Sequence, residues 1–355
     1  MEGLSVDIIW EEYGLDQLQQ GLSDLFPGST FSLRQVFSQI LQGDVLGAIR
    51  DILNAMLGDI GGQLAGMRNV LLWLVMLGIV SALMSHFMEI FDKHQIADIS
   101  FYFMYLLLTA VLLASFGQTV QVATDTMENI LVFIRLLVPT YLMAVGVASG
   151  TTTAGASHQL VLLLIYGVER VLVGGLLPFI YSYVLLAVVN GIWIEEKLSL
   201  LMELLEKAIK AALKTIIGVV TGISVFQAVI TPVIDTAKSS TLQKVVSAIP
   251  GIGGAADSVV SLVIGSAVVI KNSIGVVLLI LLVSMCLAPL LQILLTACCL
   301  KLAAAVMGIV SDKRITACTN KVGEGSMMLL RITGTALLLF LISISVVAVS
   351  TNHGL

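Results

Sequence analysis

Charged side chains are scarce in this chain, and their scarcity decides its class. Only 12% of the 355 residues are charged, whereas 58% are hydrophobic and the mean hydropathy is +1.03. Soluble domains carry about 25% charged residues. A hydrocarbon core about 30 Å thick needs roughly 20 apolar residues per helical span, and runs of that length recur from Val70 onward. The composition therefore predicts an integral membrane protein.

Alternation of apolar and polar residues over segments of about ten, the mark of a transmembrane barrel, is also missing. The apolar runs are instead solid blocks of Leu, Val, Ile and Ala. We therefore expect an all-α, polytopic helical membrane protein with about seven transmembrane helices and additional amphipathic surface helices.

The residues of catalytic and metal sites are few as well. The chain has four cysteines and four histidines, with no CxxC pair and no histidine at metal spacing, so we expect reduced, packed thiols, no metal site and no cofactor. No Ser/His/Asp or Cys/His set and no carboxylate pair stands at useful spacing, which argues against an enzyme. The absence of a basic patch with interleaved aromatics argues against nucleic acid as a partner.

The acidic residues are concentrated near the start of the chain. Residues 1–69 carry nine acids against three arginines, with apolar residues at helical spacing. We expect an acidic, amphipathic-helical amino-terminal region at 1–69, followed by a multi-span membrane domain at 70–350. The seven predicted spans are approximately 70–91, 99–118, 129–148, 160–189, 215–234, 274–297 with an apolar extension to 310, and 329–350.

Residues 194–214 differ from the spans around them, because apolar and charged residues share a helical period. Glu203 with Lys207, and Glu206 with Lys210, are i,i+4 pairs. This segment predicts an amphipathic helix that lies along a membrane surface or another protein. Its apolar face consists of Leu198, Leu201, Leu205, Ile209 and Leu213.

Lysines and arginines in short loops predict orientation. The loop with Lys93, the lysines of 194–214 and the stretch "SDKRITACTNKVGEG" all favour the cytoplasmic side, which places residues 1–69 outside. Seven simple spans would instead put helix 194–214 outside. Either one segment among 129–189 is irregular, with 160–189 and its Gly174, Gly175 and Pro178 the first suspect, or that helix is external.

Three charges fall within apolar runs: Arg135, Glu169 and Arg170. Charges inside spans are expensive and favour a polar lining or an ion pair between helices. The alternative is that Arg135 extends to an interface and Glu169 marks a helix end.

Glycine and proline mark candidate breaks in the helices. "IPGIGGAADS" lacks the lysine and spacing of a phosphate loop, and the third glycine of a dinucleotide fingerprint is replaced by Ala256. What remains is a turn into a re-entrant or tilted helix, or a plain interhelical loop. The candidate break or hinge residues are Pro250, Gly251, Gly253, Gly254, Pro178 and Pro289.

The segment 247–306, which contains this IPGIGG stretch, resembles the stage III sporulation protein AE family of endospore-forming bacteria. Two further segments share the resemblance: "TGISVFQAVITPVIDTAKSSTLQKVV" before it and "LDQLQQGLSDLFPG" near the start. The resemblance covers nearly the whole chain in layout. It implies a multi-pass protein of the mother-cell membrane around the forespore, part of a secretion-like channel, or feeding tube, between the two cells. It supplies no catalytic residues.

The resemblance also implies partners: other stage III sporulation A-group proteins, including an ATPase-like AA subunit and ring-forming AG and AH subunits, and stage II sporulation protein Q. A homo-oligomer stays open. Family members commonly begin with an apolar signal-like segment, which "MEGLSVDIIWEE" does not match, so the outside placement of residues 1–69 rests on charge. Two other functions remain as alternatives, an independent secondary transporter and a passive scaffold for soluble subunits.

Overall fold

The computed structural model is helical throughout the part of the chain that it describes, apart from short turns, and contains no strand there. This confirms the predicted all-α class. The described residues are 68–83, 94–149, 166–193, 197–246, 286–309 and 311–350, with isolated positions at 35–51, 164 and 279–284.

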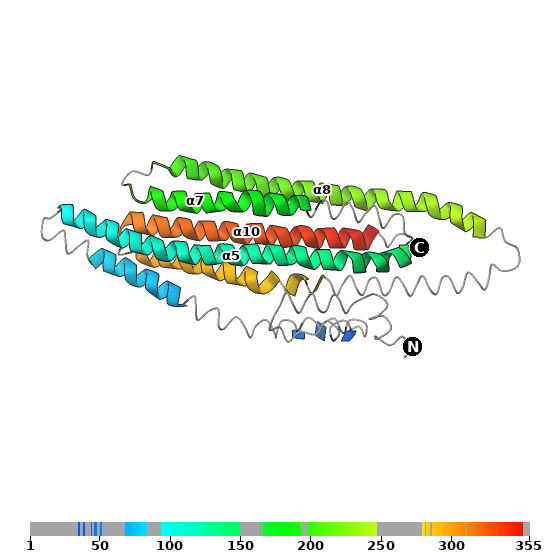
Figure 1. Cartoon of the computed structure of the whole chain (residues 1–355), viewed down its shortest axis with the longest axis horizontal. Coiled ribbons are helices and arrows are strands. Elements are labelled where there is room, and N and C mark those ends of the chain that lie inside the picture. The colour runs from blue at the N-terminus through cyan, green and yellow to red at the C-terminus, as the bar shows by residue number, and fades with distance from the viewer. Residues whose placement is uncertain are drawn as a thin grey trace.

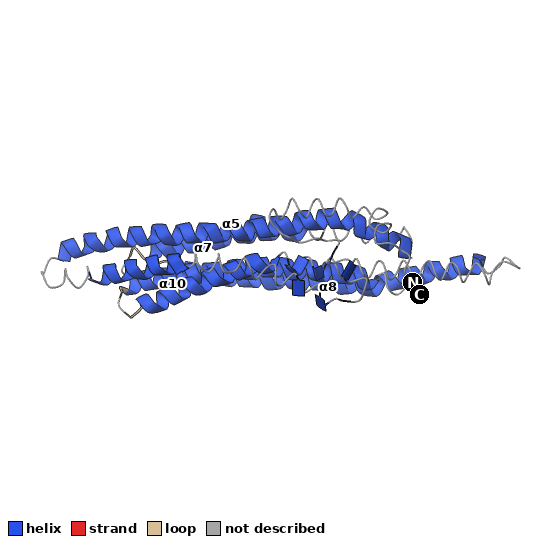
Figure 2. Ribbon diagram, turned by 90° about the horizontal axis from the view of Figure 1, so that it is seen from below, coloured by secondary structure: helices blue, strands red, loops and turns tan. Residues whose placement is uncertain are grey.

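The helices lie side by side in one elongated bundle (Figures 1 and 2). The central helix is α10, which contacts α5, α7 and α8. Aromatic and aliphatic side chains fill the space between these helices, with Tyr105, Phe116 and Tyr183 almost fully buried. The helices are Arg68–Leu83, α5 (His94–Ser149), π-helix η1 (Leu172–Leu176) followed by α7 (Leu177–Asn190), α8 (Ser199–Val246), Leu282–Met307 and α10 (Lys313–Ser350).

Helix α5 joins two segments that the sequence predicts as separate spans, 99–118 and 129–148. It runs without interruption over 56 residues, about 84 Å at 1.5 Å per residue. The polar stretch between the predicted spans stays helical because one of its faces, with Ala123 and Met127, is buried in the bundle. Its threonine hydroxyls are satisfied within the helix, where Thr119 donates to the Ser115 carbonyl at 2.9 Å and Thr126 to the Val122 carbonyl at 2.6 Å. The expected loop there is wrong.

In the described part of the chain, four helices are long and apolar enough to cross a membrane: Ile99–Phe133, Tyr166–Asn190, Leu282–Met307 and Lys313–Ile342. The shorter Arg68–Leu83 is also apolar. The predicted count of seven spans is therefore not confirmed within the described residues.

The suspected irregularity at 160–189 is a π-helical turn, η1, directly before α7. The Leu177 N–H donates to the Leu172 carbonyl, five residues back. Pro178 follows in the first turn of α7. Proline has no N–H to donate and its ring clashes with the carbonyl four residues back, so a wider turn at this place relieves the clash.

The basic turns of the chain gather at one end of the bundle, which we call the basic end (Figure 1). Here the Tyr105 hydroxyl of α5 donates to the Val188 carbonyl of α7 at 2.6 Å, and the Arg314 guanidinium of α10 lies 3.5 Å from the centre of the Phe101 ring of α5. The continuous α5 removes one membrane crossing from the predicted order. The start of α5, Lys197 and Lys313 can therefore share one side, and the conflict between loop charge and alternation disappears.

The amphipathic helix predicted at 194–214 is the first part of the longer α8, which begins at Ser199. Met202, Ile209 and Leu213 are buried and α8 contacts α7 and α10, so part of the predicted apolar face packs within the bundle. That this face lies along a membrane surface or another protein stays a prediction. Of the predicted face, Leu198 and Leu205 are half-buried, and Leu201 is 44% exposed.

Both predicted ion pairs of α8 are present, Glu203 with Lys207 at 2.7 Å and Glu206 with Lys210. The first pair is well exposed. Lys207 holds the pKa of Glu203 below its usual range, and Glu203 raises the pKa of Lys207, in each case through a hydrogen bond between them. An exposed pair of this kind adds little to stability.

Candidate functional site

The three charges predicted within spans do not form a polar centre among the described residues. Arg135 is exposed on α5 and Arg170 is exposed just before η1, while Glu169 is half-buried. None of them forms an ion pair with another described residue. Arg135 and Arg170 therefore lie on the surface of the described bundle, and Glu169 lies partly within it.

The predicted breaks fall into two groups. Pro250, Gly251, Gly253 and Gly254 lie outside the described residues. Pro178 lies in the first turn of α7, and Pro289 is half-buried within helix Leu282–Met307.

The four cysteines, all of them among the described residues, form no disulfide bond, and Cys286 and Cys318 are buried. Cys298 is exposed, however, so the expectation that all four thiols are packed is wrong for this residue.

A partly buried polar cluster joins α7 to α10 near the basic end, and we call it the Glu324 cluster. The Tyr183 hydroxyl donates to Glu324 Oε2 at 2.7 Å, and the Lys321 ammonium donates to the same oxygen at 2.9 Å. Asn320 donates to Oε1 at 3.3 Å. Three donors from two helices therefore converge on one carboxylate inside a candidate membrane span.

Two glycines place this carboxylate between its neighbouring helices. A Cβ atom on Gly325 would clash with Val184 Cγ2 of α7 and lie 3.3 Å from the Phe116 ring of α5. A Cβ atom on Gly323 would lie 3.1 Å from Lys301 Cγ of helix Leu282–Met307. The Gly-Glu-Gly sequence thus lets three helices approach α10 around Glu324.

The charged groups of the cluster, Glu324 and Lys321, are only partly shielded from solvent. The Glu324 side chain is 27% exposed and that of Lys321 is 39% exposed, whereas Tyr183 is fully buried. A carboxylate with phenol and ammonium donors can hold helices in register, and it can also accept or release a proton.

Sequence reasoning missed Glu324 because "SDKRITACTNKVGEG" looks like a basic loop. In the structure these residues are the first turns of α10, which begins at Lys313. The available signal was a carboxylate between two glycines immediately before a long apolar run.

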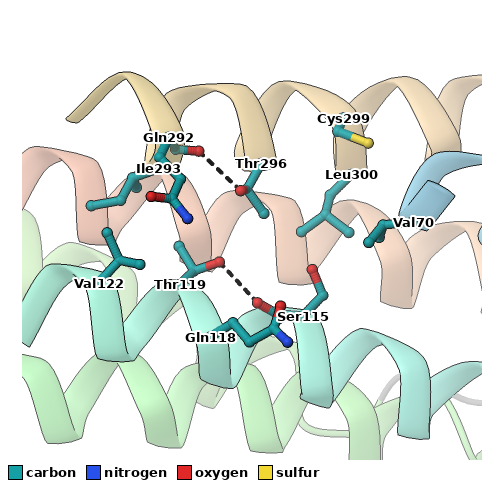
Figure 3. A pocket seen from close by; sticks show the side chains of 10 residues that line it. All are labelled: Val70, Ser115, Gln118, Thr119, Val122, Gln292, Ile293, Thr296, Cys299 and Leu300. Carbon is teal, nitrogen blue, oxygen red and sulfur yellow. Dashed lines mark hydrogen bonds between the residues drawn. The ribbon is translucent and has the colours of Figure 1, made fainter. Parts of the chain in front are cut away.

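A second polar feature is a pocket of about 240 Å³ between α5 and helix Leu282–Met307, which we call the glutamine pocket. Figure 3 shows Ser115, Gln118 and Thr119 of α5 facing Gln292 and Thr296 across it. Thr296 donates to the Gln292 carbonyl at 2.9 Å, as Thr119 does to Ser115.

The two glutamines are the groups of this pocket that can bind a ligand. The hydroxyls of Thr119 and Thr296 donate to their own helices, whereas the amides of Gln118 and Gln292 make no hydrogen bond with another described residue. Amide groups in an apolar helix pair are left to bind water or a polar ligand. No group of three or more metal-binding side chains occurs in the described part of the chain.

Comparison with known proteins decides the family. The family model for stage III sporulation protein AE matches residues 31–351, nearly the whole chain. The chain belongs to this family.

A stage III sporulation protein AE from Bacillus subtilis (strain 168) is 20% identical over 315 residues, which is 88% of this chain and 79% of that protein. No solved structure matches the chain. The Glu324 cluster and the glutamine pocket both lie within the residues matched by the stage III sporulation protein AE model. The resemblance seen in the sequence is thereby confirmed, and family membership implies a role in sporulation.

Proposed function

We propose that this chain is a membrane subunit of the channel that joins mother cell and forespore and is required for sporulation after engulfment. Membership of the stage III sporulation protein AE family supports the role in sporulation. The four helices that are apolar and long enough to cross a membrane support a multi-pass protein, which we place in the mother-cell membrane around the forespore.

The structural observation that best supports a channel role is the Glu324 cluster. A charge within a membrane span is expensive, and it persists where it contacts water, a substrate path or another subunit. Glu324 has three donors and still exposes about a quarter of its side chain. This partial exposure suits a group that faces a hydrated path or an interface between subunits.

The activity that we propose is non-enzymatic. Tyr183 and Lys321 fix the Glu324 carboxylate by their hydrogen bonds, while Gly323 and Gly325 allow the helices to close around it. In this arrangement the chain positions a polar group inside the membrane, and other subunits supply energy. We propose as partners the other stage III sporulation A-group proteins and stage II sporulation protein Q.

The test is genetic replacement in the host. The gene is deleted and restored as wild type, as Glu324→Gln or as Glu203→Gln, and late forespore reporter activity and heat-resistant spores are measured. We expect the deletion to arrest sporulation after engulfment with a silent reporter. Normal spores from the deletion strain would refute the proposal.

The glutamine pocket favours a second function, an independent secondary transporter. A polar pocket between two spans, with two amides that lack partners among the described residues, suits a small polar substrate. Uptake by the purified protein in liposomes that falls after Gln292→Leu would favour the transporter. Flux only in the presence of other sporulation subunits would favour the channel.

A scaffold is the third function that the sequence left open, and the argument for it came from the amphipathic helix at 194–214. Because part of the apolar face of α8 packs on its own bundle, that argument is weaker. Capture of ring subunits without any flux would be the result that supports a scaffold.

A further inference from the structure

A second pocket, of about 370 Å³, borders the turn between helix Leu282–Met307 and α10 at the basic end. Its walls are formed largely by small residues, among them Ala304, Ala305 and Ala317. Gly308 brings the turn so close to α10 that a Cβ atom there would lie 3.3 Å from Thr316 Cγ2. The small side chains leave room for a ligand between the two helices. We call this space the lysine pocket.

The charge of the lysine pocket is positive. Lys301 and Lys313 line it from its two helices, and neither forms an ion pair with a carboxylate in the described part of the chain. The nearby carboxylates have cationic partners of their own. Asp312 binds Arg314 at 3.2 Å, and Glu324 binds Lys321 at 2.9 Å. Lys313 is thus available to an anion, and Lys301, whose charge also acts on Glu324, forms no ion pair with it that would keep it from the pocket.

A buried hydroxyl points to the same kind of ligand. The Ser311 Oγ atom lines this pocket, is shielded from solvent and makes no hydrogen bond with any described residue. Buried polar groups in native proteins nearly always have a partner. The neighbouring Thr316 hydroxyl donates to the Asp312 carbonyl at 3.3 Å and is satisfied. An acceptor oxygen in the pocket would satisfy Ser311 and meet both ammonium groups.

The surroundings of the pocket favour an anion that carries aliphatic chains. Leu302 and Val306, on the helix that forms one wall, are 59% and 46% exposed, and Ile309, in the turn that follows this helix, is 84% exposed. Both flanking helices are candidate membrane spans. A phosphate held by the lysines would thus have its acyl chains beside an exposed apolar surface, as at the headgroup level of a bilayer.

We propose that the lysine pocket binds the phosphate of an anionic phospholipid headgroup. Two ammonium groups and one serine hydroxyl donate to the phosphate oxygens, and the acyl chains lie against the exposed aliphatic side chains. This site borders the Glu324 cluster, because Asn320 lines the pocket and donates to Glu324, but the lipid contacts do not depend on the channel role.

The experiment measures lipid retained by the purified full-length protein. The protein is released from micelles that contain phosphatidylglycerol or phosphatidylcholine, and native mass spectrometry counts the bound lipids. We expect phosphatidylglycerol to be retained preferentially. The variant with Lys301→Gln and Lys313→Gln should retain it about a hundredfold less or weaker still, since each of the two lost charge-assisted contacts is worth about 1.5 kcal/mol or more and 1.4 kcal/mol is tenfold.

The matched control carries Lys207→Gln and Lys214→Gln, which remove the same charge from the exposed surface of α8. It should retain phosphatidylglycerol like the parent. Equal losses in both double variants, or equal retention of phosphatidylcholine by the parent, would overturn the proposal.

A second variant tests the pocket without a change of charge. Ala317→Leu fills the space between the helices and should reduce retention as the lysine substitutions do. Full retention in this variant would overturn the location of the site. Inorganic phosphate added at about 10 mM, a concentration far above that of typical specific ligands, should not displace the lipid. Complete displacement would show that the pocket recognises free phosphate and would overturn the lipid assignment.

Discussion

At the scale of the residue, one carboxylate and two glycines distinguish α10 from an ordinary apolar helix. Glu324 accepts three hydrogen bonds, and Gly323 and Gly325 give its neighbours room. Most buried polar residues elsewhere in the described bundle are serines and threonines, many of which donate to their own helix. A substitution that changes a single atom is therefore expected to affect stability and sporulation most when it falls in the Glu324 cluster.

Replacing Glu324 with Gln should lower both stability and sporulation. The substitution keeps the shape of the side chain but leaves Lys321 without its ion pair, and we expect a loss of about 1–3 kcal/mol in unfolding free energy. Thermal denaturation of the purified protein measures the first effect and the count of heat-resistant spores the second. Glu203→Gln breaks an exposed pair and should behave like wild type in both assays.

Gly325 and Gly334 provide a matched pair on α10. Gly325→Ala places a methyl group against Val184 and should destabilise the protein by about 1–3 kcal/mol through overpacking. Gly334→Ala meets open space and should be neutral or stabilise by up to about 1 kcal/mol through helix propensity. Equal unfolding midpoints for the two variants would show that α7 and α10 do not approach closely at Gly325.

The sequence could reveal the ion pairs of α8 at this scale, because spacing alone determines which side chains on a helix meet. It could not reveal the Glu324 cluster. Tyr183 and Glu324 are 141 positions apart, and only the packing of α7 on α10 brings them together. Of the three charges that the sequence did single out, Arg135 and Arg170 are exposed and Glu169 is half-buried, since a charge in an apolar run does not show which way its helix face turns.

At the scale of the element, helix ends were harder to predict than helices. A polar stretch such as 119–128 has the composition of a loop, but Ala123, Thr126 and Met127 are buried on one face of α5. Tertiary packing of this face therefore continues a helix that bilayer thickness alone would end, and the threonine hydroxyls are satisfied by carbonyls of the same helix.

A proline inserted into this stretch distinguishes a helix from a loop. Ala123→Pro removes one backbone hydrogen bond in the middle of α5 and should destabilise the protein by about 3 kcal/mol or more. Ala123→Gly, which keeps the N–H, should lose only about 1 kcal/mol by propensity. The measurement is thermal unfolding in detergent, and a proline variant as stable as the parent would favour a loop.

The π-helical turn before α7 makes a sharper prediction. Deleting Gly174 shortens the wide turn to an ordinary one, which brings the Pro178 ring against the carbonyl four residues back and should destabilise the helix by about 3 kcal/mol. The same deletion combined with Pro178→Ala should recover most of the loss. Without recovery, the wide turn would have some cause other than the proline. Unfolding midpoints of the parent and the two variants decide between these outcomes.

At the scale of the whole molecule, the turns with basic residues share one end of the bundle. Charge in the loops predicted this shared side, and the expected number of spans contradicted it. The continuous α5 shows that the span count was the weaker argument. Loop charge reports on the side of the membrane directly, whereas a count of spans fails whenever one helix contains two apolar runs.

Accessibility of single cysteines tests this arrangement. In a variant with Cys286, Cys298, Cys299 and Cys318 replaced by serine or alanine, cysteines introduced at Lys197 and Lys313 should react with a membrane-impermeant maleimide from the same side. A cysteine at Ser149, at the other end of α5, should react from the opposite side. Labelling of positions 197 and 313 from opposite sides would contradict the bundle.

The length of α5 also means that a small tilt of this helix gives a large displacement at its far end. A tilt of about 5° at the basic end moves the far end of a helix about 84 Å long by about 7 Å. Because α10 packs along α5, a tilt of α5 would move α10 in the same direction. A displacement too small to open the packing around Glu324 thus becomes a movement at Ser149 that is wider than a water molecule.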